Sequence, residues 1–113
     1  MDGQLSRKKV IGSPIYEESL ERTFVEGIER FGMFQARKYL EHILNTVEKL
    51  ENDYPYYPEC RHLTTKSRMY WNIILDSHLI IYCITEERIK VLDIVHSASS
   101  MRKIKKTKNI HIE

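Results

Sequence analysis

The chain has 113 residues, of which 42% are hydrophobic and 30% are charged; this length and composition suffice for one folded domain and exclude a disordered chain. The formal net charge is only +2, so no strong overall field is expected, and the placement of the positive charges decides their effect. The first residues lack the apolar core of a signal peptide, and no apolar stretch reaches the roughly 20 residues of a membrane span, so we expect a cytoplasmic protein without membrane contact.

Positive charge is concentrated near the two ends of the chain, whereas acidic residues are concentrated between Glu17 and Glu51. The basic residues at the ends are Arg7, Lys8, Lys9, Arg102, Lys103, Lys105, Lys106 and Lys108. This segregation is typical of a basic surface that faces an anionic partner, and equally of two solvated chain ends. We predict a single domain over residues 1–113, with flexible ends at residues 1–7 and 106–113.

The first predicted elements are a short strand at residues 9–11 and a helix after it. Gly12 ends the strand, Ser13 is suited to accept a hydrogen bond from the first helical turn, and Pro14 has the backbone angle of the first helical position. Apolar residues then recur at spacings of four, four and three, which indicates one apolar stripe. These residues are Leu20, Phe24, Ile28 and Phe31.

A second helical pattern follows Gly32 and ends near Asn52 and Asp53, where Pro55 prevents its continuation. Its apolar stripe consists of Ala36, Leu40, Ile43, Leu44, Val47 and Leu50. Because only a few residues around Gly32 separate the two patterns, they predict an antiparallel helical hairpin whose apolar stripes face a common sheet.

Three or four strands are predicted in the second half of the chain, where β-branched and aromatic residues are frequent, and residues 61–66 are the optional one. They lie at residues 61–66, 70–75, 79–84 and 89–96, with turns at residues 76–78 and 86–87. Short links between consecutive strands require antiparallel pairing. The predicted fold is α+β, in the order β-α-α-β-β-β(β), with a two-helix hairpin packed on one face of an antiparallel-rich sheet and cationic groups presented from the other face.

Several local phrases, taken with this order of elements, resemble the RelE/ParE toxin superfamily, which includes plasmid stabilisation proteins. The resemblance extends from about Lys9 to Lys105. The phrases are Val10-Ile11-Gly12-Ser13-Pro14, Phe31-Gly32, Pro58-Glu59-Cys60-Arg61-His62-Leu63, the pair Tyr70-Trp71-Asn72-Ile73-Ile74 with Leu79-Ile80-Ile81-Tyr82-Cys83-Ile84, and Ile94-Val95-His96. The resemblance implies the same α+β fold.

The resemblance also implies a toxin of a type II toxin–antitoxin system that a cognate antitoxin neutralises. Some members cleave messenger RNA on the ribosome, and ParE-like members block DNA gyrase. We expect growth inhibition through translation, by metal-independent endoribonuclease cleavage of mRNA on the ribosome. The alternatives are a ParE-like gyrase inhibitor and an attenuated member that only binds antitoxin. An apolar surface that two helices leave uncovered would fit an antitoxin or a homodimer contact.

RNA cleavage of this kind needs cations near the reacting phosphate and a group that transfers a proton, but no metal. By the family's pattern, the candidate residues are Arg61, Lys66, Arg68, Tyr82, His96 and Arg102. Four of them have structural alternatives: Tyr82 within an apolar strand is commonly a core aromatic, and His96 equally suits the end of a sheet. Lys66 and Arg68 bracket a turn and equally suit plain solvation.

Other features limit the chemistry that the sequence supports. Where close relatives often carry arginine after each tyrosine, this chain has Trp71 and Cys83, which cannot stabilise a phosphate by charge. Cys60 and Cys83 form no paired motif, so we expect reduced thiols. Neither the cysteines nor the histidines have the spacing of a zinc site, and we predict no metal and no cofactor.

Overall fold

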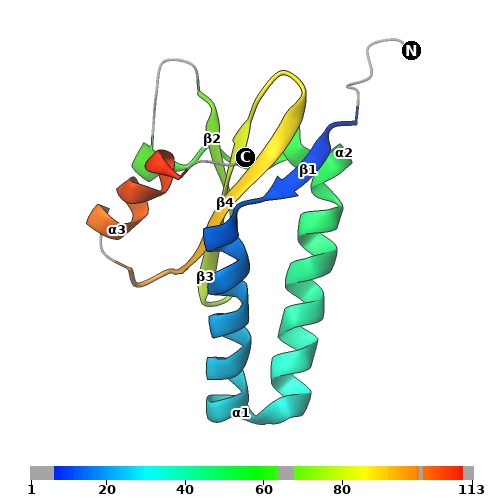
Figure 1. The fold of residues 1–113 in the computed structure, drawn as a ribbon, viewed down its shortest axis with the longest axis vertical. Coiled ribbons are helices and arrows are strands. Elements are labelled where there is room, and N and C mark those ends of the chain that lie inside the picture. The colour runs from blue at the N-terminus through cyan, green and yellow to red at the C-terminus, as the bar shows by residue number, and fades with distance from the viewer. Residues whose placement is uncertain (1–6, 64–67, 100, 111–113) are drawn as a thin grey trace.

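A computed structural model describes residues 7–63, 68–99 and 101–110 of the chain. Figure 1 shows the elements in order along the chain. They are β1 (Lys9–Gly12), α1 (Pro14–Glu48), α2 (Leu50–Asp53), β2 (Tyr70–Ile74), β3 (His78–Ile84), β4 (Arg88–His96) and α3 (Met101–Lys105), with 3₁₀ turns at Tyr54–Tyr56 (η1), Arg61–Leu63 (η2) and Lys106–Asn109 (η3). The predicted α+β class is confirmed.

The four strands form one mixed sheet in the order β1-β4-β3-β2. Strands β2, β3 and β4 pair antiparallel, as their short links require, whereas β1 pairs parallel to β4. A parallel pair needs a long crossover connection. The whole helical hairpin lies within this crossover. β1 stands at the sheet edge, beside the last strand.

The start of α1 is capped as the sequence predicts. The Ser13 Oγ accepts a hydrogen bond from the Tyr16 amide at 2.9 Å and donates one to the Leu92 carbonyl at 2.6 Å. Ser13 is fully buried. One hydroxyl therefore satisfies a helix amide that would otherwise lack a partner and also ties the start of α1 to β4.

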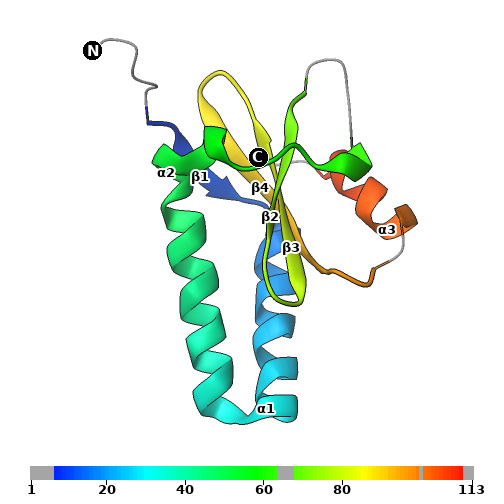
Figure 2. The same cartoon turned by 180° about the vertical axis from the view of Figure 1, so that it is seen from behind.

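The helical hairpin is a single element that reverses direction at Gly32. There the backbone has φ +87° and ψ 164°, a conformation that glycine alone adopts readily. The two arms run side by side and project well beyond the sheet (Figures 1 and 2). Near the sheet the hairpin buries Tyr16 and Ile43, but at the far end Phe31 is 68% exposed and Phe34 is 73% exposed. The expectation that the sheet covers the whole apolar stripe is therefore wrong for Phe31.

Each face of the sheet carries its own apolar core. We call the side packed against α1 the hairpin face; its core contains Tyr16, Ile43, Leu50, Tyr54, Ile73, Ile80, Tyr82, Ile89, Val91 and Ile94. We call the opposite side the outer face; its core contains Cys60, Leu63, Ile81, Cys83, Leu92, Val95 and Ile104. The outer face was expected to present cationic groups, but residues of η2 and α3 cover it, because its apolar side chains must also be removed from water.

Two further expectations differ from the structure. Residues 61–66 were predicted as a strand, but Arg61–Leu63 form a 3₁₀ turn, and residues 64–66 lie outside the described residues. The chain just before this turn covers the edge of β2, where the Cys60 amide donates to the Tyr70 carbonyl at 2.9 Å. Residues 106–113 were predicted to be flexible, yet Lys106–Asn109 form a 3₁₀ turn in which Thr107 is 2% exposed.

Candidate functional site

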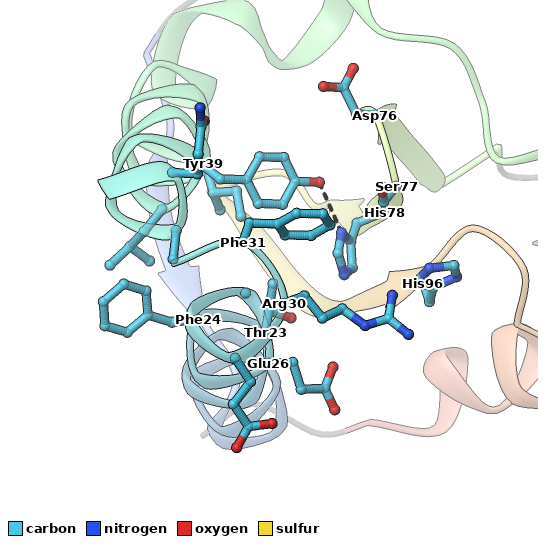
Figure 3. Close-up of a pocket in the computed structure, with 16 residues that line it drawn as sticks. Thr23, Phe24, Glu26, Arg30, Phe31, Tyr39, Asp76, Ser77, His78 and His96 are labelled. Atoms are coloured by element: carbon cyan, nitrogen blue, oxygen red, sulfur yellow. Dashed lines mark hydrogen bonds between the residues drawn. The ribbon is translucent and has the colours of Figure 1, made fainter. Parts of the chain in front are cut away.

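The main cavity lies between the helical hairpin and the end of the sheet where β3 begins and β4 ends, and it has a volume of about 710 Å³. Figure 3 shows how the side chains of both elements line it. Its apolar lining comes from Phe24, Phe31, Ala36, Leu40 and Ile43, and its polar lining includes Glu26, Glu29, Arg30, Tyr39, Asp76, His78 and His96. The hairpin therefore supplies both apolar and polar lining residues, and the end of the sheet supplies Asp76, His78 and His96.

The register between β3 and β4 brings two histidines together at this cavity. His78 and His96 are direct cross-strand partners, and they lie on the same side of their strands as the core residues Ile80 and Ile94. Their ring centroids are 5.4 Å apart, with the planes at 72°. Both imidazoles therefore belong to the hairpin face, at its uncovered end.

Tyr39 on the second arm of α1 holds His78 from the other side of the cavity. The Tyr39 hydroxyl and the His78 Nδ1 are 2.8 Å apart, and the backbone amide of Ser77 hydrogen-bonds to the same hydroxyl. Burial lowers the pKa of His78, and the neighbouring His96 lowers it further, while Glu26 acts in the opposite direction. The neutral form of His78 is therefore favoured, and a neutral imidazole can donate a hydrogen bond or transfer a proton.

Of the six residues predicted from the sequence, the five that the structure describes do not form one site. Tyr82 is completely buried in the core of the hairpin face, and its hydroxyl donates to the Tyr54 carbonyl at 2.8 Å. Burial raises the pKa of Tyr82 well above that of a free tyrosine. His96 is exposed and lines the cavity. Of these two residues on the hairpin face, His96 alone is accessible to a ligand.

The predicted cations lie on other elements. Arg61 is exposed in η2, and Arg102 is exposed in α3, which packs against η2 over the outer face. Arg68 has φ 52° and forms an ion pair with Glu59 at 3.5 Å. Lys66 lies outside the described residues. Arg61 and Arg102 therefore lie on elements over the opposite face of the sheet from Tyr82 and His96, which belong to the hairpin face.

The last described segments of the chain, α3 and η3, carry a basic surface. Ile104 and Thr107 are buried and anchor α3 and η3, while the basic residues before, between and after them are exposed. The exposed cations are Arg102, Lys103, Lys105, Lys106 and Lys108, and we call them the C-terminal basic surface. At the other end of the chain, Lys8 has a structural role, since its Nζ donates to the carbonyls of Thr85 and Glu86 at 2.6 and 2.8 Å.

Sequence reasoning missed Arg30, Tyr39 and His78, because each looks like an ordinary polar residue in its own segment. A signal existed for the histidine pair. If residues are paired outward from the turn at residues 86–87 and β4 contains one bulge residue, residue 78 lies opposite residue 96. The structure has this bulge near Ile81 and Tyr82. No local pattern indicates that Tyr39 reaches the same point.

The part of the chain that the structure describes contains no group of three or more histidine, cysteine or acidic residues placed to hold a metal ion. Within the same residues, no helix combines the length and the apolar character that crossing a bilayer requires.

Comparison with known proteins gives a family and a fold. The family model for the ParE toxin of the type II toxin–antitoxin system parDE matches residues 11–101. Among solved structures, the chain is similar to one from the chromosomal ParDE TA system of P. aeruginosa, with a TM-score of 0.66, 12% identity, and coverage of 80% of this chain and 96% of that chain. No curated protein matches the sequence.

Proposed function

We propose that this chain, which belongs to the ParE toxin family of type II toxin–antitoxin systems, blocks DNA gyrase by binding and does not cleave RNA. The observation that carries this proposal is the separation of the candidate catalytic residues. In-line cleavage needs cations and a proton-transfer group around one phosphate. Tyr82 is buried, and Arg61 and Arg102 lie on elements that cover the opposite face of the sheet from His96.

The positions that depart from the family's pattern also support binding over catalysis. Cys83 is 6% exposed in the core of the outer face, and Trp71 packs against the core of the hairpin face. An arginine at position 83 would bring its charge among the apolar side chains of this core, which costs free energy unless the charge is paired. In this chain the two positions contribute apolar packing and not phosphate contacts.

The C-terminal basic surface is suited to an anionic macromolecular partner such as the gyrase–DNA complex. Its cations are solvent-exposed, while Ile104 and Thr107 fix the backbone that carries them. Exposed cations on a fixed backbone attract a polyanion and release its counterions on binding. We therefore assign this surface to the target, and we place the protein in the cytoplasm, where gyrase acts.

Membership of this toxin family implies that the chain has an antitoxin partner. The far end of the hairpin exposes several large apolar side chains, which are Val25, Phe31, Met33 and Phe34. Large apolar side chains that are exposed together at one end of an element typically mark a protein contact. We assign it to the antitoxin, and sedimentation velocity of the free toxin distinguishes this assignment from contact with a second copy.

The test is a comparison of two purified reactions, DNA supercoiling by gyrase and mRNA integrity during cell-free translation. We expect loss of supercoiling with intact mRNA. Removing two cations with Lys106→Gln and Lys108→Gln should raise the inhibitory concentration about tenfold at physiological salt. The matched variant Arg37→Gln with Lys49→Gln removes two exposed cations from the hairpin and should leave inhibition unchanged.

A ribosome-dependent endoribonuclease remains the second candidate, supported by the two imidazoles and the arginine that line the open cavity. Cleaved mRNA with normal supercoiling would establish it and refute gyrase inhibition. If neither reaction changes while antitoxin still binds, the protein is an attenuated member of the family.

A further inference from the structure

Three hydrogen-bond donors converge on the cavity between the hairpin and the sheet. The Arg30 side chain extends from the first arm of α1 toward the rings of His78 and His96 (Figure 3). Among residues 7–63, 68–99 and 101–110, no hydrogen bond or ion pair engages the Arg30 guanidinium or the Nε2 atom of either histidine. The cavity therefore contains a set of polar groups that lack protein partners.

The contacts at Nδ1 determine what each imidazole offers at Nε2. The His96 Nδ1 accepts the Ala98 amide proton at 3.0 Å, so in neutral His96 the ring proton is on Nε2. With the Ser77 amide as a donor to its oxygen, the Tyr39 hydroxyl can use its own proton for the His78 Nδ1 at 2.8 Å. This arrangement favours the Nε2–H form of His78 as well. Both rings thus present N–H donors.

Two N–H donors beside a guanidinium match an oxyanion. We propose that Arg30, His78 and His96 bind a carboxylate that a partner polypeptide presents beside apolar side chains. The planar fork of a guanidinium pairs with both oxygens of a carboxylate, and charge-assisted hydrogen bonds of this kind are about twice as strong as neutral ones. The remaining lone pairs of the carboxylate face the two imidazole donors.

The surroundings of the donors favour a carboxylate over a phosphate. Glu26, Glu29 and Asp76 also line the cavity, and their charges would repel a phosphate dianion more strongly than a single carboxylate. They also disfavour a nucleic-acid backbone, which carries one charge at every phosphate.

The size and lining of the cavity favour a polypeptide. A volume of about 710 Å³ is far larger than one carboxylate group, and Phe24, Phe31 and Leu40 supply an apolar wall along the rest of it. An acidic residue of a polypeptide would occupy the polar part of the cavity, and the apolar residues beside it would occupy the apolar part. This site lies on the hairpin face, away from the C-terminal basic surface, so the inference stands independently of gyrase as the target.

The experiment uses the full chain with ¹⁵N-labelled histidine and three small probes. The probes are 4-phenylbutyrate, which carries a carboxylate on an apolar arm, the neutral 4-phenylbutyramide, and phenyl phosphate. Long-range imidazole ¹H–¹⁵N spectra report both the tautomer and the occupancy of each Nε2. We expect saturable shifts at the Nε2 of His78 and His96 with phenylbutyrate, and at least about tenfold weaker binding of the amide.

Two variants locate the carboxylate. Arg30→Gln should weaken phenylbutyrate binding at least about tenfold, because the charge-assisted pair is lost. Arg37→Gln removes an exposed arginine of the second arm that does not line the cavity, and it should bind the probe as the parent does. Equal binding of acid and amide, or equal weakening by both variants, would overturn the proposal.

Tyr39 is a positioning residue in this proposal. Tyr39→Phe should weaken probe binding and shift His78 toward a mixture of tautomers in the ¹⁵N spectrum, whereas His96 keeps its Nε2–H form. An unchanged His78 tautomer would contradict the assigned role of Tyr39. Tighter binding of phenyl phosphate than of phenylbutyrate would contradict the choice of carboxylate and would indicate a phosphate site in its place.

Discussion

The two ends of the helical hairpin have similar apolar content but different surroundings. Near the sheet, Tyr16 and Ile43 are 4% and 0% exposed, whereas at the reversal point Phe31 and Phe34 are 68% and 73% exposed. Both regions belong to the single element α1. An amphipathic pattern therefore indicates which residues are able to be buried, but the length of the sheet decides which of them the chain itself covers.

This difference separates stability from interaction within one helix pair. Apolar side chains near the sheet remove surface from water in the free protein, and those at the far end do so only when a partner binds. The hairpin is thus a folding element at its base and an interaction element at its tip. Substitutions at the two ends should accordingly have different consequences.

The largest expected effect comes from truncating one apolar residue at each end. Ile43→Ala should lower the free energy of unfolding by about 3 kcal/mol, since it removes buried methyl groups and leaves a cavity. Phe34→Ala should change it by less than about 0.5 kcal/mol, because the ring is largely solvated. Urea unfolding followed by circular dichroism measures both. Similar losses at the two positions would mean that the tip is covered in the free protein.

A smaller effect distinguishes two buried tyrosines at the base of the hairpin. The Tyr82 hydroxyl donates to the Tyr54 carbonyl, so Tyr82→Phe should cost about 1 kcal/mol. The Tyr16 hydroxyl is buried without a partner among the described residues, so Tyr16→Phe should be neutral or stabilising, because no hydrogen bond is lost. Thermal unfolding of the two variants side by side tests this contrast, and a clear loss for Tyr16→Phe would indicate an internal water.

The last prediction concerns a buried acid that joins the hairpin base to the opposite layer. Asp93 is 7% exposed, and its Oδ1 accepts the Ile94 amide at 2.7 Å. Burial raises the pKa of Asp93, and hydrogen bonds from Ser19 and Ile94 and the charges of Lys103 and Arg22 only partly oppose this.

Because the folded pKa of Asp93 lies above the unfolded value, its contribution to stability is present below the unfolded pKa and is lost as pH rises through the folded one. Asp93→Asn removes this dependence. The variant should therefore gain in unfolding free energy relative to the parent as pH rises from about 4 to 7. Parallel unfolding curves at all pH values would show that the carboxyl is not perturbed by burial.

Local signals in the sequence determined most elements of this protein. Ser13 before Pro14 indicates the helix start, Gly32 indicates the reversal, and apolar runs indicate the last three strands, because capping, backbone freedom and side-chain alternation act over a few residues. The family resemblance was also visible in short phrases. The strand expected at residues 61–66 was wrong over Arg61–Leu63, where apolar packing under the chain prevailed over β propensity.

The site depended on contacts that no local signal encodes. The register of β3 with β4 brings His78 beside His96, and the hairpin carries Arg30 and Tyr39 to the same cavity. The same packing buries Tyr82 and leaves Arg61 and Arg102 on elements over the opposite face of the sheet from the histidines. Short-range preferences decide where helices and strands form, but only the joint burial of two apolar faces decides which polar side chains meet, since that outcome depends on residues far apart in the chain.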